Sequence, residues 1–328
     1  MSGPDKPAGM PRGPGGVVVL GEVLVELSAL SPWKDGGSLR LAFSGDALNA
    51  AAASAAAGAH TVLVARVPDD ELGDALVQRV AELGIDTRHL IRTGGQHGVY
   101  LSHADPEGLR QFAYARKGSA GSELSPEDLD EDLLRGAGVV LGSGVACAIS
   151  PSAAAAVHRA AEIAPRFVYD PNFRPRLTSA RDAAEHLRRL APLAEVVTPS
   201  WPGEVGDLLG LPAQSAAEAV QGILALGARD VVLTCGSAGV LLWHAGTLEH
   251  IPGVHAPLVV DQTGAGDCLT GTLVARLAVG DDLAEAARLA VAAAALSVQG
   301  QGGTGHIPTL DETRSARAAA SLQGADQP

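Results

Sequence analysis

The sequence has few aromatic residues, few cysteines and no long apolar run. Aromatic residues make up only 3% of the 328-residue chain, so alanine, valine and leucine must fill its core. The cysteines Cys147, Cys235 and Cys268 form no CxxC pair, and the ten histidines show no metal-ligand spacing, so a disulfide framework or a zinc site is not expected. No apolar run of about 18 residues is present to span a membrane, and residues 1–16 lack the apolar centre of a signal peptide. We expect a cytoplasmic protein with no membrane partner.

Positive charge is also scarce. The chain has 24 Lys and Arg against 37 Asp and Glu, which gives a formal net charge of −13. A nucleic-acid-binding surface needs clustered Lys and Arg, so we expect no nucleic-acid partner. Any anionic ligand must be bound by locally concentrated positive charge and by helix N-termini.

Short apolar runs alternate with alanine-rich helical stretches along most of the chain. Such runs are typical of strands buried on both faces of a parallel sheet, and the intervening stretches are typical of the helices that cover it. We expect one domain over residues 16–312, with disordered tails at 1–15 and 313–328. The predicted strands are 17–20, 61–66, 137–142, 166–170, 195–198 and 230–235, and the predicted helices include 47–58, 71–84, 180–191 and 216–227.

Two early segments, about 22–45 and 97–118, alternate between apolar and polar residues instead. Alternation indicates strands with one face free. We expect the two segments to pair as a small β-sheet that covers a cleft as a lid. An exposed lid sheet could also pair with a second subunit, which makes a homodimer a possible assembly.

The stretch DQTGAGDCLTGTLVARLA, residues 261–278, places glycines and an aspartate at the start of an apolar helix. Gly264, Ala265 and Gly266 lack bulk, so an anion can approach their backbone N–H groups at the positive end of the helix dipole. The carboxylate of Asp267 could then take a proton from a hydroxyl group that attacks a phosphoryl group. A simple capped helix with a glycine turn is the alternative for this stretch alone.

The D-x-x-G-A-G-D pattern resembles the second signature of the ribokinase-like (PfkB) carbohydrate kinases. The resemblance implies a three-layer α/β/α sandwich with a mainly parallel central sheet and a small β-sheet lid. It also implies that Asp267 is the general base and that the backbone of Gly264, Ala265 and Gly266 holds the transferring phosphate of ATP. Gln262 stands where family members usually have Ser or Thr.

A second stretch, FSGDALNAAAASAAAGAHTVLVARVPDDELG over residues 43–73, resembles the first signature of the same family. By this resemblance Gly45, Asp46 and Asn49 bind the sugar, with Ser44 at the position of the first glycine. Glycine lets a sugar lie against the backbone, and an asparagine can hydrogen bond two hydroxyl groups.

Two further loops resemble the nucleotide and metal sites of the family. CGSAG, residues 235–239, resembles the G-x-x-G nucleotide loop, and TPSWPGE, residues 198–204, falls where the family has N-x-x-E. Glu204 matches the glutamate that helps to place Mg²⁺ through water. The implied nucleotide-binding residues are Ser200, Thr234, Gly236, Ser237 and Gly239, together with Gly264 and Gly266.

The patterns Y-x-R-K-G-S-A, from residue 114, and D-x-N-F-R-P-x-L, from residue 170, resemble the 2-keto-3-deoxygluconate kinases within the family. They imply that Tyr100, Tyr114, Arg116, Asn172 and Arg174 surround a sugar acid. Arginine suits this role because it pairs with a carboxylate through charge-assisted hydrogen bonds. The expected function is ATP- and Mg²⁺-dependent phosphorylation of the primary hydroxyl of 2-keto-3-deoxygluconate. A fructokinase, ribokinase or sulfosugar kinase, and a non-catalytic sugar or nucleotide sensor, remain as alternatives.

Overall fold

The computed structural model describes residues 16–29, 34–103, 111–210 and 215–325. Its main element is a nine-stranded sheet with the order β13-β12-β11-β10-β9-β8-β1-β4-β5. The pairs from β5 to β11 are parallel, and β12 and β13 extend the sheet as antiparallel strands. The strands are β1 Gly16–Leu20, β4 His60–Pro68, β5 Leu90–Thr93, β8 Val139–Ser143, β9 Phe167–Asp170, β10 Val196–Val197, β11 Asp230–Thr234, β12 Gly239–His244 and β13 Thr247–Pro252.

Strand β1 shows why the apolar runs form the centre of the sheet. Val17 and Val19 point into the core on one face, whereas Val18 and Leu20 point into the core on the other. Because both faces are covered, every residue of the strand is buried, and an apolar residue is stabilising at each position. The predicted strands are confirmed for the same reason.

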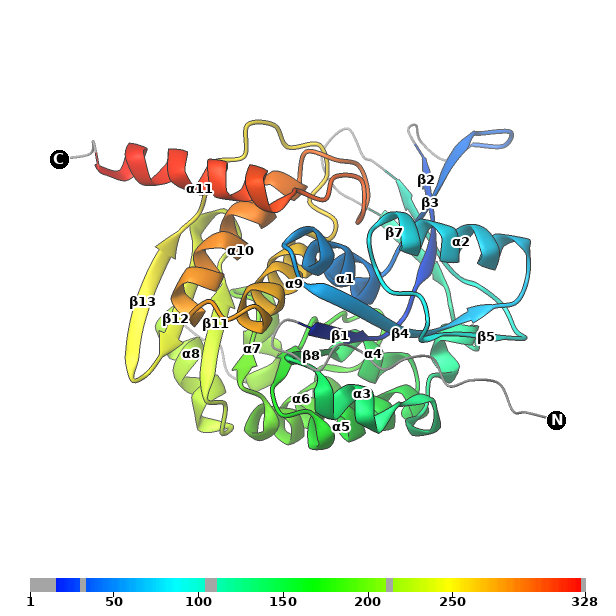
Figure 1. Cartoon of the computed structure of the whole chain (residues 1–328), viewed down its shortest axis with the longest axis horizontal. Coiled ribbons are helices and arrows are strands. Elements are labelled where there is room, and N and C mark those ends of the chain that lie inside the picture. The colour runs from blue at the N-terminus through cyan, green and yellow to red at the C-terminus, as the bar shows by residue number, and fades with distance from the viewer. Residues whose placement is uncertain (1–15, 30–33, 104–110, 211–214, 326–328) are drawn as a thin grey trace.

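Helices cover both faces of this sheet, as Figure 1 shows. The core on one face includes α1, α2, α9 and α10, and the core on the other includes α3 to α8. The predicted three-layer α/β/α sandwich is therefore confirmed. The helices are α1 Asp46–Ala56, α2 Glu71–Glu82, α3 Glu131–Gly136, α4 Gly144–Ile149, α5 Pro151–Ile163, α6 Ala180–Leu190, α7 Gly203–Leu209, α8 Ala216–Ala225, α9 Ala265–Ala278, α10 Leu283–Ser297 and α11 Leu310–Ala325.

A separate four-stranded sheet, called the small sheet below, has the order β3-β2-β6-β7. Its strands come from the two alternating segments, and Figure 1 shows it beside α2, apart from the main sheet. Residues 30–33 and 104–110 of those segments lie outside the described residues. Strands β2 and β6 are parallel, and the outer pairs are antiparallel. The strands are β2 Leu24–Ala29, β3 Leu39–Ser44, β6 Gly98–His103 and β7 Gln111–Ala115.

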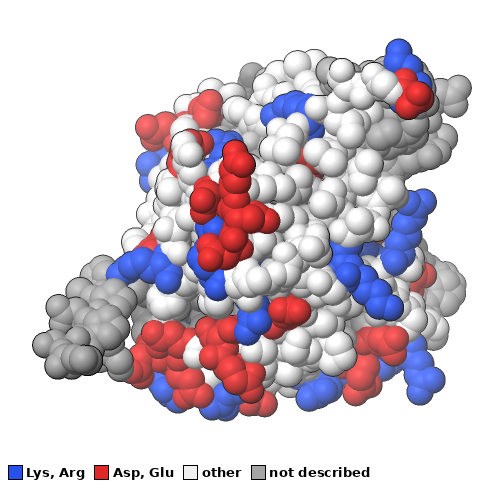
Figure 2. Space-filling model, turned by 90° about the vertical axis from the view of Figure 1, so that its right-hand side faces the viewer, with Lys and Arg blue, Asp and Glu red and all other residues white. Residues whose placement is uncertain are grey.

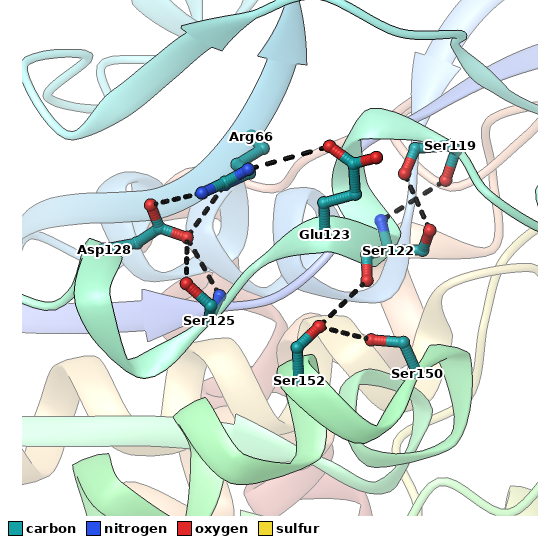
Figure 3. Close-up of polar contacts among 8 residues, drawn as sticks. All are labelled: Arg66, Ser119, Ser122, Glu123, Ser125, Asp128, Ser150 and Ser152. Carbon is teal, nitrogen blue, oxygen red and sulfur yellow. Dashed lines mark hydrogen bonds and ion pairs between the residues drawn. The ribbon is translucent and has the colours of Figure 1, made fainter.

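The chain that leaves the small sheet is fixed to the main domain by polar contacts, which Figure 3 shows. This segment contains two short 3₁₀ helices, η1 Ala120–Glu123 and η2 Pro126–Asp128. Arg66 of β4 donates to both carboxylate oxygens of Asp128, at 2.8 and 2.9 Å, and pairs with Glu123 at 3.6 Å. These contacts attach η1 and η2, which follow β7 in the chain, to the main sheet.

The prediction of a disordered tail over residues 313–328 is wrong up to Ala325, because these residues continue α11. The helix begins with a capping box: the Thr309 hydroxyl accepts the N–H of Glu312, and the Glu312 carboxylate accepts the N–H of Thr309 at 2.8 Å. An ion pair between Arg317 and Glu285 joins α11 to α10. Residues 1–15 and 326–328 of the predicted tails lie outside the described residues.

The surface on the small-sheet side has mixed charge. Figure 2 shows Lys and Arg interleaved with clusters of Asp and Glu on the face that points to the right in Figure 1.

None of the helices in the described part of the chain combines the length and the apolar character needed to cross a bilayer.

Candidate active site

A cleft of about 1050 Å³ lies between the small sheet and the ends of several main-sheet strands. Asp170, Thr198 and Thr234 stand at or just after the carboxyl ends of β9, β10 and β11, where open α/β sheets bind their ligands. Most of the predicted site residues line this one cleft. They are Gly45, Asp46, Asn49, Tyr100, Tyr114, Arg116, Asn172, Arg174, Ser200, Glu204, Thr234, Gly264, Gly266 and Asp267.

Close contact between α1 and α9 brings two halves of the cleft together. A Cβ atom at Gly271 of α9 would lie 2.1 Å from the carbonyl oxygen of Ala50 on α1, so only glycine permits this approach. The alanines of α1 allow the same closeness from the other side. As a result Asn49 of α1 lies beside Asp267 of α9, although 218 residues separate them in the sequence.

Asp267 does not cap its own helix. Its Oδ2 accepts a hydrogen bond from the Asn49 side-chain amide at 2.8 Å, and its Oδ1 accepts one from the Asn172 amide at 3.0 Å. Burial raises the pKa of Asp267, while the two amide donors and the charge of Arg174 favour the carboxylate. Asn172 was predicted as a sugar ligand, and the structure gives its amide group a contact with the aspartate as well as a place in the cleft.

The first turn of α9 lines the cleft through Gly264, Gly266 and Asp267. Gly264, the N-cap, has φ 81. Because glycine has no side chain, the N-cap residue cannot accept a hydrogen bond from the first amides of the helix. The N–H of Ala265 instead donates to the Gln262 carbonyl at 3.2 Å, and Ala265 does not line the cleft. The amides at Gly264, Gly266 and Asp267 are therefore the better placed donors.

Asp170 and Glu204 add two carboxylates to the floor of the cleft. The Glu204 carboxylate accepts the N–H groups of Phe173 and Ser200, both at 2.6 Å, and thereby joins two loops. Burial raises the pKa of Asp170 well above its usual range, and the negative charges of Glu204 and Asp267 raise it further. Mg²⁺ prefers hard oxygen ligands, and the negative charges of these two carboxylates are only partly balanced by nearby cations. Asp170 and Glu204 could therefore hold Mg²⁺, directly or through water.

Asp46 lies at the first position of α1 and lines the cleft. Its carboxylate accepts a hydrogen bond from the hydroxyl of Ser143. Burial and the charge of Asp267 nevertheless raise the pKa of Asp46 to about 6. The cleft therefore keeps a carboxylate at a position where its charge is costly.

The two predicted arginines differ in their surroundings. Arg116 follows β7 and pairs with the buried Glu22 at 3.1 Å, and its guanidinium lies 4.8 Å from the centre of the Tyr114 ring. Burial raises the pKa of Glu22 to about 7 despite this pairing. Arg174 donates to the Phe173 carbonyl at 3.1 Å and lies on the exposed side of the cleft. Both cations face the same space.

The predicted nucleotide residues divide into two groups. Thr234 and Ser200 line the cleft and are joined by a β-bridge. Gly236 and Ser237 belong to η4, Gly236–Ala238, which is exposed, and neither they nor Gly239 line the cleft. This loop begins two residues after Thr234 in the chain.

Several residues that the sequence reasoning missed also belong to this region. Asp170 could have been found, since it ends a predicted strand and opens the D-x-N-F-R pattern. Glu22 gives no local signal, because its partner Arg116 lies 94 residues away. Lys117 and Arg176 line the cleft as well and add two cations to those predicted.

Comparisons with known proteins agree with this geometry. Residues 15–310 match the model of the pfkB family carbohydrate kinases. The chain is 34% identical over 309 residues to 2-dehydro-3-deoxygluconokinase of Thermoproteus tenax, covering 90% of this chain and 92% of that protein. It is 28% identical over 309 residues to 5-dehydro-2-deoxygluconokinase of Shouchella clausii, with 91% and 94% covered.

A solved structure gives the same result for the fold. A candidate ribokinase II of E. coli, solved in complex with ATP and Mg²⁺, has a TM-score of 0.84 at 26% identity, with 93% of this chain and 99% of that chain covered. The family match extends over nearly all of the described residues and includes both signature stretches. The chain therefore belongs to the pfkB family of carbohydrate kinases.

Proposed function

We propose that this protein uses ATP and Mg²⁺ to phosphorylate the primary hydroxyl of 2-keto-3-deoxygluconate, which is the same compound as 2-dehydro-3-deoxygluconate. The observation that supports the proposal most directly is the buried Asp267 carboxylate, oriented by two amide donors at the start of a glycine-entered helix inside the cleft. The similarity to the Thermoproteus tenax kinase supports the choice of sugar acid.

In the proposed reaction Asp267 accepts the proton of the substrate hydroxyl as the hydroxyl oxygen attacks the γ-phosphorus of ATP. The amide donors Asn49 and Asn172 fix both carboxylate oxygens, so the base is held in one orientation before the substrate arrives. A general base of this kind contributes about 10²- to 10⁴-fold in rate.

Backbone amides at Gly264, Gly266 and Asp267 then stabilise the negative charge on the transferring phosphoryl group. Mg²⁺, when bound, supplies further neutralisation of the phosphate oxygens. Asp170 and Glu204 are the residues with the donor chemistry to hold it. Thr234, Ser200 and the loop at Gly236–Gly239 bind the nucleotide in this proposal.

The specificity for an acid rests on the positive charge of the cleft. Arg116, Lys117, Arg174 and Arg176 line it, and these cations can pair with a substrate carboxylate. Gly45, Asp46, Tyr100 and Tyr114 complete the sugar site in this assignment. Arginine pairing with a carboxylate is strong because the hydrogen bonds are charge-assisted and bidentate.

A panel of sugars tests the proposal. The purified protein, ATP and Mg²⁺ are assayed for ADP release with 2-keto-3-deoxygluconate, fructose, ribose and a sulfosugar, and the product is identified by mass spectrometry and ³¹P NMR. We expect the highest kcat/KM with 2-keto-3-deoxygluconate and a phosphate ester on its primary carbon. A preference for fructose or ribose would assign the chain to another sugar kinase, and no ADP release with any sugar would favour a sensor.

We further propose that the small sheet is a lid that closes over the sugar and excludes water, and that its outer face pairs two subunits. Leu39 and Leu41 of β3, 43% and 51% exposed, support the second point. Sedimentation velocity on the wild type and on Leu41→Glu tests it, because the variant should sediment as a monomer if the pairing is real. We also propose a cytoplasmic location, supported by three unpaired cysteines.

A further inference from the structure

A second hollow, of about 630 Å³, shares Ala148 and Ile149 with the cleft. Three side chains from successive helices meet in its wall: Cys147 of α4, His158 of α5 and His186 of α6. The Cys147 sulfur and one ring nitrogen of each histidine all lie within 4.8 Å of one another. Sequence spacing did not reveal this cluster, because the three helices bring the residues together only in the folded chain.

A thiol and two imidazoles are a donor set typical of Zn²⁺. With Zn–S near 2.3 Å and Zn–N near 2.0–2.1 Å, tetrahedral coordination places the donor atoms about 3.3–3.7 Å apart. His158 Nε2 and His186 Nδ1 lie 2.9 Å apart, slightly too close, and the remaining pairs need to approach by up to about 1.3 Å. The fourth coordination position would face the open hollow.

The protonation states of the histidines suit a metal ligand. Burial lowers the pKa of His158 to about 4, with contributions from the charges of Arg189 and His186. Burial, followed by Arg189, lowers the pKa of His186 as well. Burial raises the pKa of Cys147 to about 12, so the ion would have to displace the thiol proton.

The residues around the three side chains include a tyrosine next to Cys147 and charged groups of both signs. Tyr169 lies near Cys147 and lowers the pKa of its thiol, so its hydroxyl could orient a thiolate. Glu162 and Asp182 line the hollow and attract a cation, whereas Arg159 and Arg189, which also line it, oppose one. The hollow also gives an ion a route from the solvent.

From this geometry we propose that Cys147, His158 and His186 form a binding site for a divalent transition-metal ion of the Zn²⁺ type, distinct from the Mg²⁺ position in the cleft. Such an ion would tie α4, α5 and α6 together. Since α4 also contributes Val145, Ala148 and Ile149 to the cleft wall, the bound ion would stabilise the folded state next to the substrate.

The test uses the full chain without a histidine tag, titrated with Co²⁺ as a spectroscopic probe. We expect one Co²⁺ per chain, tetrahedral d–d bands, a thiolate-to-cobalt charge-transfer band, and displacement of Co²⁺ by Zn²⁺. Cys147→Ser should abolish the charge-transfer band, and His158→Gln and His186→Gln should each weaken binding at least tenfold. As matched controls, Cys235→Ser and His255→Gln should bind Co²⁺ like the wild type.

A second measurement does not depend on a fully buried side chain. Zn²⁺ should raise the Tm of the wild type but not that of His186→Gln, whose ring is partly exposed. Arg189→Gln should bind Zn²⁺ severalfold more tightly, because it removes an opposing charge. The proposal is overturned if the wild type shows no thiolate-to-cobalt band, if Cys147→Ser keeps that band, or if Zn²⁺ stabilises His186→Gln as much as the wild type.

Discussion

Asp46 offers a prediction in which stability and activity change in opposite directions. Its pKa rises from 3.8 to about 6 because of burial and the nearby charge of Asp267. A carboxyl whose pKa is raised on folding binds its proton more tightly in the folded state. Its contribution to stability is fully present below the unfolded pKa of 3.8 and is lost as the pH rises through about 6. Asparagine resembles the protonated carboxyl at every pH, so Asp46→Asn should keep the stabilisation that the wild type loses.

The size of the effect follows from the same values. The difference between 3.8 and about 6 corresponds to a ceiling of about 3 kcal/mol at 25 °C. Since Asp46 lines an open cleft, water screens part of this cost, and we expect a gain of about 1–2 kcal/mol in the free energy of unfolding above pH 7. The gain should shrink towards zero as the pH is lowered to 4. Kinase activity should be lost at the same time, since the carboxylate is proposed to hold sugar hydroxyls.

Urea unfolding at pH 4.5, 6 and 8 measures the prediction. Asp207→Asn, at an exposed aspartate of α7, is the matched control and should change the free energy of unfolding by less than about 0.5 kcal/mol at each pH. A variant Asp46→Asn that is less stable than the wild type at pH 8, or that gains equally at all three values, would refute the electrostatic reasoning.

Three other substitutions probe the cleft. Arg174→Ala should raise KM for 2-keto-3-deoxygluconate much more than for a neutral ketose, and equal effects would make the arginine structural. With a sugar acid, KM should rise between pH 6 and 8. Burial raises the pKa of Glu22 to about 7, so in this range Glu22 ionises and competes with the substrate carboxylate for Arg116. Glu22→Gln should flatten the pH dependence of KM, and an unchanged slope would exclude the competition. Gly271→Ala should lower the free energy of unfolding by about 1–3 kcal/mol and lower kcat, since the new Cβ would lie 2.1 Å from the Ala50 carbonyl oxygen. Chemical unfolding measures the change, and a variant as stable as the wild type would contradict the close contact between α1 and α9.

The main architecture could be predicted because burial acts on local patterns. The run VVVL becomes β1 since both faces of the sheet are covered, and the alternating segments become the small sheet since they are less completely enclosed. The composition of the tail favours disorder, but TLDE at residues 309–312 is a capping-box sequence, and this local signal is the one that α11 follows.

The position of a site residue was predictable where a motif carries it, as for Asp267 and Asn49, which lie together in the cleft. Contacts between segments that are distant in the sequence were not predictable. Glu22 meets Arg116, Asn172 meets Asp267, and the cluster of Cys147 with two histidines forms, only when separate elements pack together. No local spacing encodes such contacts, because they depend on the crossing of helices and the order of strands.

The central claim is that Asp267 deprotonates the sugar hydroxyl in this cleft. The most direct measurement compares the wild type with Asp267→Asn in steady-state turnover of 2-keto-3-deoxygluconate and in calorimetric binding of the same sugar. We expect kcat to fall by about 10²- to 10⁴-fold, while the sugar Kd stays close to that of the wild type. Turnover of Asp267→Asn near the wild-type rate would contradict the account.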